Sequence, residues 1–110
     1  MARLPPALAA DATSRILEAL GDPPGRVLEL GFAGIHATPL RLAGFDVVVV
    51  EPDPAYVARA RERAGVVLPE PPADAFDAVV AHEDADITGI DAREVLLLRQ
   101  DGSVWSSVSP

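Results

Sequence analysis

Cysteine is absent from the 110 residues of this chain, and only two residues are histidine. Without cysteine the chain can form no disulfide bond, use no thiolate nucleophile and bind no metal through sulfur. Two histidines are also too few to build a zinc site from nitrogen ligands. The sequence therefore predicts a domain that is stabilised by its core and has no metal site.

Long apolar runs are also missing. Neither the N-terminal segment nor any later stretch has the uninterrupted apolar run that a signal peptide or a membrane-spanning helix needs. We therefore expect a cytoplasmic protein that does not have a membrane as a partner.

Positive charge is scarce, because nine basic residues, all arginine, stand against seventeen acidic residues and give a net charge of −8. An acidic surface of this kind repels the phosphate groups of nucleic acids and the head groups of anionic lipids. The balance of charge therefore argues against nucleic acid as a partner.

The first part of the chain contains one predicted helix and one predicted strand. A length of 110 residues suits a single domain over residues 1–110. Residues 1–10 are rich in proline and alanine, and we expect them to form a loosely ordered arm. Asp11 or Thr13 can cap a helix that ends at a turn rich in proline and glycine, after which residues 26–30 form a short apolar strand.

The middle of the chain alternates helices and strands. A glycine turn after the first strand leads into a helix that has Thr38 as a possible cap and stops at Gly44. Residues 45–50 are the most strand-prone run, and their lack of polar alternation predicts a parallel strand with helices on both faces. Asp53 and Pro54 then suit the N-cap and the first position of a further helix.

The last part of the chain adds strands without clear helices. Residues 66–68 and 76–81 form two further strands, and residues 69–75 between them form a proline-rich loop. Two strand-prone segments on either side of Asp101 and Gly102 indicate a hairpin at the edge of the sheet. Strands that alternate with helices imply a mostly parallel sheet with right-handed crossovers, in the α/β class.

A glycine turn and an acidic residue follow two successive strands, where a parallel sheet binds its ligands. Gly31 follows the first strand, and Glu51 follows the second about 20 residues later. Small residues let a ligand approach the backbone, and a carboxylate accepts hydrogen bonds from two ribose hydroxyl groups. The pattern indicates a site for an adenosine-containing cofactor. The other interpretation is a tight turn at Gly31 and a solvated strand end at Glu51.

The segments around these residues resemble the cofactor-binding half of class I S-adenosylmethionine (SAM)-dependent methyltransferases. Residues 27–34 (VLELGFAG) resemble the acidic, glycine-rich first motif of that family, and residues 45–53 resemble its second strand with the ribose-binding acid. Residues 76–80 resemble its fourth strand, so the resemblance covers roughly residues 11–81. It implies a minimal Rossmann-like three-layer sandwich of the α/β class, with a mostly parallel sheet and a C-terminal antiparallel hairpin at the edge.

The resemblance also implies SAM as the cofactor and a role for individual residues. Glu29 and Gly31 would shape the pocket for the methionine part of SAM, and Glu51 would bind the ribose. Pro52 or its neighbour would flank the adenine. Together with the other small residues of the first motif, the implied cofactor site consists of Glu29, Gly31, Ala33, Gly34, Glu51 and Pro52.

The first motif departs from the pattern of the family. The alternating glycines of the family would fall at positions 31, 33 and 35, but this chain has Gly31, Ala33 and Ile35, with a glycine displaced to Gly34. The proline-rich loop over residues 69–75 stands where the family has a helix, and the substrate-binding insertions of the family are absent. Few residues of this chain would therefore enclose a methyl acceptor.

Two functions are open on this evidence. The first is a SAM-binding methyltransferase-like domain without its own substrate-binding part, which a homodimer or a partner protein would complete. The second is a non-catalytic Rossmann-like interaction or regulatory module that has lost cofactor binding. A pocket filled by Phe32 or Ile35 would favour the second function, and an open cleft would favour the first.

The segment after the fourth strand and the C-terminal strand hold the remaining candidates. His82 is the one candidate for a catalytic group, as a general base, and its other interpretation is a surface histidine in an acidic turn. Glu83, Asp84 and Asp86 lack an ordered ligand spacing and are interpreted as a solvated loop. Trp105 lies on the predicted edge strand, either half-buried or as a dimer contact.

Overall fold

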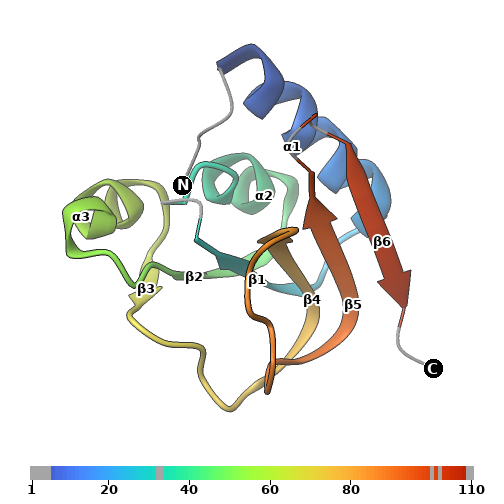
Figure 1. Ribbon diagram of the computed structural model, residues 1–110. Coiled ribbons are helices and arrows are strands. Elements are labelled where there is room, and N and C mark those ends of the chain that lie inside the picture. The colour runs from blue at the N-terminus through green and yellow to red at the C-terminus, as the bar shows by residue number, and fades with distance from the viewer. Residues whose placement is uncertain (1–5, 32–33, 100, 102, 109–110) are drawn as a thin grey trace.

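The computed structural model describes residues 6–31, 34–99, 101 and 103–108, which form one six-stranded sheet with helices. The strands lie in the order β3-β2-β1-β4-β5-β6. In chain order they are β1 (Arg26–Leu30), β2 (Asp46–Val50), β3 (Val66–Leu68), β4 (Ala75–His82), β5 (Asp91–Leu98) and β6 (Val104–Val108). The first five pair in parallel, and β6 pairs antiparallel with β5 at the edge (Figure 1). The predicted α/β class, the mostly parallel sheet and the edge hairpin are confirmed.

Three helices accompany the sheet within the described residues. They are α1 (Pro6–Leu20), α2 (Ala37–Ala43) and α3 (Pro54–Arg63). Helix α1 precedes β1, whereas α2 and α3 are the crossovers from β1 to β2 and from β2 to β3. In the part of the chain that the structure describes, no helix is both long enough and apolar enough to cross a membrane.

Helix α1 begins earlier than the sequence predicts. The predicted arm covers residues 1–10, but the helix already starts at Pro6. Proline suits the first position of a helix, and the alanine-rich segment behind it has high helix propensity. Asp11 and Thr13 therefore lie inside α1 and not before its start, and the side chain of Thr13 is buried. The rest of the predicted arm, residues 1–5, lies outside the described residues.

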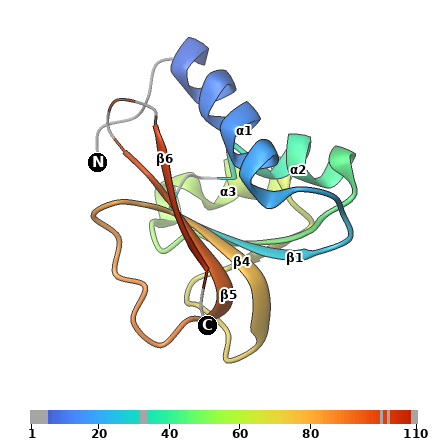
Figure 2. The same cartoon turned by 90° about the vertical axis from the view of Figure 1, so that its right-hand side faces the viewer.

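All three helices cover the same face of the sheet (Figure 1 and Figure 2). Their apolar side chains, among them Ile16, Leu40 and Ala60, join residues of the strands in one core. On the other face, the described core residues come from strands, and Ile90 from the connection between β4 and β5 packs against them. The predicted three-layer sandwich with helices on both faces therefore needs a correction, because loops take the place of the third layer.

The valine run of β2 shows why both faces need cover. Val47 and Val49 pack in the core on the helix side, whereas Val48 and Val50 pack in the core on the other face. Successive side chains of a strand point to opposite faces, so an uninterrupted apolar strand must be covered twice. The two-sided burial that the sequence predicts for residues 45–50 is confirmed, although only one of the two covers is helical.

The predicted signals at the end of α2 and at the start of α3 are confirmed. Gly44 ends α2 in the left-handed conformation, with a φ of 110°. Asp53 is the N-cap of α3 and accepts a hydrogen bond from the backbone N–H of Ala55, and Pro54 occupies the first turn. These residues act through local geometry alone, which is why the sequence identifies them.

The predicted cap at the start of α2 is wrong. His36 occupies the N-cap position of α2, and Thr38 lies inside the helix. The hydroxyl group of Thr38 donates a hydrogen bond to the backbone oxygen of Arg63 at 3.1 Å. Thr38 therefore joins α2 to the end of α3.

Gly34 lets the turn after β1 approach α3 closely. Its φ is 73°, in the left-handed region that favours glycine. A Cβ atom at this position would lie 3.3 Å from the Cα of Ala60 and 3.4 Å from the Cβ of Arg63, both on α3. The displaced glycine of the first motif thus serves the packing of a helix against the turn.

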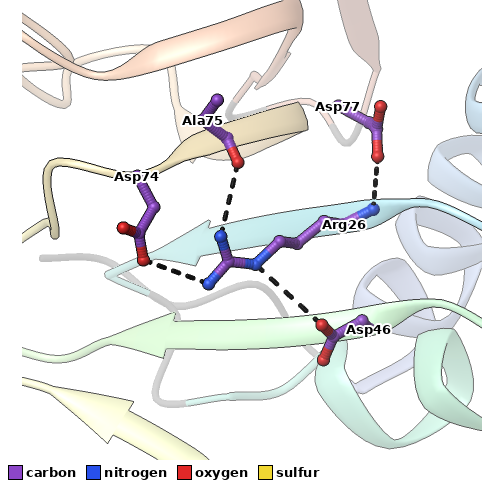
Figure 3. A network of polar contacts seen from close by, with 5 residues as sticks. All are labelled: Arg26, Asp46, Asp74, Ala75 and Asp77. Atoms are coloured by element: carbon purple, nitrogen blue, oxygen red, sulfur yellow. Dashed lines mark hydrogen bonds and ion pairs between the residues drawn. The ribbon is translucent and has the colours of Figure 1, made fainter.

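Arg26 joins three segments at the amino end of β1 (Figure 3). Its backbone N–H donates to Oδ2 of Asp77 at 2.7 Å, and its guanidinium group donates to Oδ2 of Asp74 at 3.2 Å. The guanidinium group also lies 4.6 Å from the centre of the Phe76 ring and 3.9 Å from the carboxylate of Asp46. These contacts fix β1 between β2 and β4 at the edge opposite the carboxyl ends of the strands.

Replacing Arg26 tests the importance of these contacts. We expect Arg26→Ala to lower the free energy of unfolding by about 1–2 kcal/mol, because it removes a cation–π contact and the packing of the side-chain stem. Arg93→Ala is the matched control, since Arg93 is 84% exposed and lies 3.8 Å from Oδ1 of Asp77. That control should change the free energy by less than about 0.5 kcal/mol. Urea denaturation measures both, and equal losses would contradict the prediction.

Alanine at Gly34 tests the close approach to α3. Gly21 has the same φ of 73° but nothing within 4 Å of the position of a Cβ atom. Gly21→Ala should therefore cost about 1–2 kcal/mol of stability, from backbone strain alone. Gly34→Ala should cost about 1–3 kcal/mol more, because α3 must also move. Thermal unfolding of both variants is the measurement, and an equal cost would mean that the contact with α3 does not matter.

Candidate functional site

Strand pairing brings three predicted site residues to one edge of the sheet. Leu30, the last residue of β1, pairs with Val50 of β2 on one side and with Ala81 of β4 on the other. The residues that follow these positions share the carboxyl edge of three adjacent strands: Gly31, Glu51 and His82. Open parallel sheets bind ligands at this edge.

Gly31 makes the turn out of β1. Its φ is 81°, and its backbone N–H donates to the backbone oxygen of Val50 at 3.0 Å. Glycine is required here because other residues rarely adopt this φ. Ala33, two residues further on, lies outside the described residues, so its predicted contact with a cofactor stays a prediction.

Glu29 is a fully buried carboxyl group two residues before the turn. Its Oε1 accepts a hydrogen bond from the backbone N–H of His36 at 2.8 Å. Its Oε2 is buried as well and has no hydrogen-bond partner among the described residues. Leaving a buried acceptor without a donor costs about 1–3 kcal/mol, and an atom of this kind in a native structure calls for an explanation such as a bound ligand.

The surroundings of Glu29 favour its neutral form. Burial raises the pKa of Glu29 from 4.5 to about 8, against the hydrogen bond from His36 and the charge of Arg63, which both lower it. The negative charge of Glu51 raises the pKa further. At pH 7 the carboxyl group is therefore mostly protonated, and a cation near Oε2 would favour the ionised form.

His36 connects Glu29 to α1. Its Nδ1 lies 2.6 Å from Oγ1 of Thr13, and the whole residue is 1% exposed. Burial lowers the pKa of His36 to about 4, so the ring is neutral at pH 7. The sequence analysis did not place His36 or Thr13 in the site, because they lie 23 residues apart and no motif links them.

Glu51 is held at the end of β2. It is only 5% exposed, so it does not fit the interpretation as a solvated strand end. Its Oε2 accepts a hydrogen bond from the backbone N–H of Asp53 at 3.1 Å, and its own N–H donates to the backbone oxygen of Leu68 at 2.9 Å. The next residue, Pro52, is exposed. Glu51 and Pro52 therefore lie directly after β2, and their contacts with a cofactor stay predictions.

His82 lies at the end of β4 and contacts the acidic turn that follows. Its Nδ1 accepts a hydrogen bond from the backbone N–H of Asp84 at 3.4 Å and lies 3.6 Å from Oδ2 of the same residue. Its side chain is 15% exposed. These contacts hold the ring in its own turn, and a role as a general base stays a prediction.

Other features lie away from this edge. Two hollows lined by described residues, of about 260 and 300 Å³, share Pro24, Gly25 and Asp77. Those residues lie at the amino edge beside Arg26, so these two hollows are not part of the predicted site. Within the described ranges, no group of three or more His, Asp or Glu side chains could hold a metal ion.

The arrangement at the carboxyl edge suits a ligand with both a cationic donor and hydroxyl groups. Glu29 offers a buried acceptor whose negative charge is suppressed until a cation approaches. Glu51 offers a second carboxylate on the neighbouring strand. Carboxylates accept hydrogen bonds from ammonium and hydroxyl groups alike, so the pair can recognise two parts of one molecule.

The fold is similar to that of a protein from Pyrococcus horikoshii described as a "putative RNA methyltransferase", whose crystal structure superposes with a TM-score of 0.55. The sequences are 18% identical, and the match covers 84% of this chain and 56% of that protein. This chain therefore spans little more than half the length of its structural neighbour. No family model and no curated protein matches the sequence. The likeness shows a methyltransferase-like fold.

Proposed function

We propose that this chain is a SAM-binding domain of methyltransferase type without a substrate-binding part of its own. One observation carries the proposal: Oε2 of Glu29 is buried beside the glycine turn and has no hydrogen-bond donor among the described residues. SAM contains an ammonium group that can donate to this oxygen. Its ribose hydroxyl groups suit Glu51, which lies at the end of the adjacent strand.

The chain's own residues would bind and orient the cofactor. Glu29 would hold the ammonium group of the methionine part, Glu51 would hold the ribose, and the exposed ring of Pro52 would flank the adenine. Gly31 lets the backbone turn away beside them. When bound, SAM supplies an activated methyl group, whereas the protein supplies position and electrostatics.

The substrate-binding part would come from another molecule. Among the described residues, loops rather than helices cover one face of the sheet. A second copy of this chain or a partner protein would then complete the site. A net charge of −8 argues against RNA as a substrate that this chain holds by itself.

A non-catalytic interaction or regulatory module is the alternative function. One motivation for it is Ile35, which replaces a glycine of the family pattern. The side chain of Ile35 is 36% exposed and therefore does not fill a buried pocket. Phe32, the other residue expected to fill the site, lies outside the described residues. Ile35 thus gives the alternative no support, and cofactor binding is the property that separates the two functions.

Calorimetric titration with SAM and with its demethylated product tests the proposed function. We expect saturable binding with a dissociation constant below about 1 mM, near −4 kcal/mol. Glu51→Gln keeps an acceptor for the N–H of Asp53 but loses the charge that pairs with two hydroxyl groups. This variant should bind at least about tenfold more weakly, a loss of about 1.4 kcal/mol.

Glu18→Gln is the matched control, because Glu18 is an exposed glutamate on α1. It should bind like the wild type. Unchanged binding by Glu51→Gln would remove Glu51 from the site. Absence of binding by the wild type at the detection limit would refute the proposal and leave the interaction module.

The two shifted pKa values predict how stability depends on pH. The pKa of Glu29 rises from 4.5 to about 8 on folding, so stability falls as pH rises between these values. The pKa of His36 falls from 6.5 to about 4, so stability rises with pH in that range. The two effects oppose each other from about pH 4.5 to 6.5, and Glu29 alone acts above pH 6.5.

We therefore expect the free energy of unfolding to stay nearly level from pH 5 to 6.5 and to fall from pH 6.5 to 8. The fall should be on the order of 2 kcal/mol, at about 1.4 kcal/mol per pH unit. Glu29→Gln should abolish the fall above pH 6.5. Denaturant titrations at each pH measure this, and the same fall in the variant would show that Glu29 is not protonated in the folded protein.

A further inference from the structure

The outer edge of β6 has no partner among the described elements. Strand β6 pairs with β5 alone and lies at the end of the sheet (Figure 1). The backbone N–H of Arg99 donates to the backbone oxygen of Ser103 at 2.9 Å, next to the pair Leu98 and Val104. This bond fixes which backbone groups of β6 face β5.

Hydrogen-bonded and non-hydrogen-bonded pairs alternate along an antiparallel ladder. Since Arg99 and Ser103 form a hydrogen-bonded pair, Trp105 and Ser107 also direct their backbone groups toward β5. The intervening residues of the strand direct their backbone groups the other way, toward the open edge: Val104, Ser106 and Val108. Ser106 is the middle of these three.

This spacing is self-complementary. Two copies of β6 that run antiparallel about a two-fold axis at Ser106 place Ser106 opposite Ser106 of the partner. Val104 then lies opposite Val108 of the partner, and the reverse pair follows by symmetry. Every outward-facing backbone group of β6 gains a partner in this register, whereas an axis at Trp105 or Ser107 leaves an end of the strand unpaired.

The edge at β6 also lacks the features that protect exposed strands. Residues 104–108 contain no charge and no proline, in a chain with a net charge of −8. The opposite edge strand, β3, has only three residues and is followed directly by Pro69. Short edge strands, prolines and charges are the usual means of preventing pairing between sheets.

Trp105 adds apolar surface to this edge. It is the only tryptophan and is 43% exposed. In the register about Ser106 it lies opposite position 107 of the partner. The strip is therefore uncharged and partly apolar, and it avoids placing like charges opposite each other.

We propose that two copies of this chain form a homodimer through β6, antiparallel about Ser106, so that the two sheets become continuous. The partner is a second copy because the outward backbone groups are symmetric about one small residue. Only five residues of each copy would pair, so we expect weak association, with a dissociation constant on the order of 10 μM. This inference does not depend on SAM binding.

Sedimentation velocity over a range of protein concentrations tests the dimer. The wild type should pass from monomer to dimer, and the tryptophan emission should shift to shorter wavelength over the same range. Ser106→Lys places two like charges on the axis at an exposed position and should leave a monomer. Leu42→Lys is the control, since it makes the same change of charge at a residue that is 83% exposed on α2.

A single cysteine tests the register directly, because the chain has none of its own. Paired Cα atoms at a hydrogen-bonded antiparallel position lie about 5.5 Å apart, within the range of a disulfide. Ser106→Cys should therefore oxidise to a covalent dimer, and Leu42→Cys should not. Ser106→Cys therefore tests the dimer even if Ser106→Lys fails to fold.

Two results would overturn the proposal. One is a wild type that stays monomeric at concentrations about tenfold above the expected dissociation constant. The other is a dimer that Ser106→Lys leaves intact and that Ser106→Cys does not cross-link, which would place the interface elsewhere. A normal dimer that does not bind SAM would refute only the proposed function. A monomer that binds SAM would refute only the dimer.

Discussion

The architecture depends on the burial of strands that are apolar on both faces. In β2 the alternate valines enter two different cores, so neither face of the sheet can be left to solvent. Three helices supply one cover. On the other side the chain has short connections, and Ile90 packs against the strands there. Within the described residues, helices therefore cover one side of the sheet and connections cover the other.

The helix-side cover also creates the candidate site. Helix α2 begins directly above the end of β1, so the N–H of His36 reaches the carboxyl group of Glu29. His36 in turn contacts Thr13 of α1, which joins two helices to one strand end. Burial raises the pKa of Glu29, although the hydrogen bond from His36 lowers it, and Oε2 has no donor among the described residues. An apolar residue at this position would leave the buried N–H of His36 without its acceptor, so one oxygen of Glu29 already serves the fold.

The sequence predicts those features of the fold that depend on neighbouring residues. Asp53 and Gly44 act through their own conformation, and the strand positions follow from apolar runs. The sequence does not predict the start of α1, because prolines disfavour the interior of a helix, although Pro6 suits its first position. The one-sided placement of the helices was also missed, since an apolar strand shows that it is covered but not by what.

Within the candidate site the sequence predicts position better than environment. Spacing places Gly31 and Glu51 at one edge, as the strand pairing confirms. The same spacing cannot show that Gly34 packs against α3 or that Glu29 shares a hydrogen bond with His36. Both facts depend on contacts between residues whose spacing in the sequence follows no motif. Gly34 thus keeps a glycine in the turn after β1, but it serves the packing against α3.

The proposed dimer bears on how a short chain could hold a methyl acceptor. Strand β6 runs antiparallel to β5, so Val104 lies at the carboxyl edge of the sheet, opposite Leu98. In the register about Ser106, Val108 of the partner would lie beside Val104 and so reach the same edge. His82 is two strands from β6, about 10 Å away, whereas Glu51 is four strands away, about 19 Å. The second copy would therefore approach the side of the candidate site near His82 and would leave the side near Glu51 open.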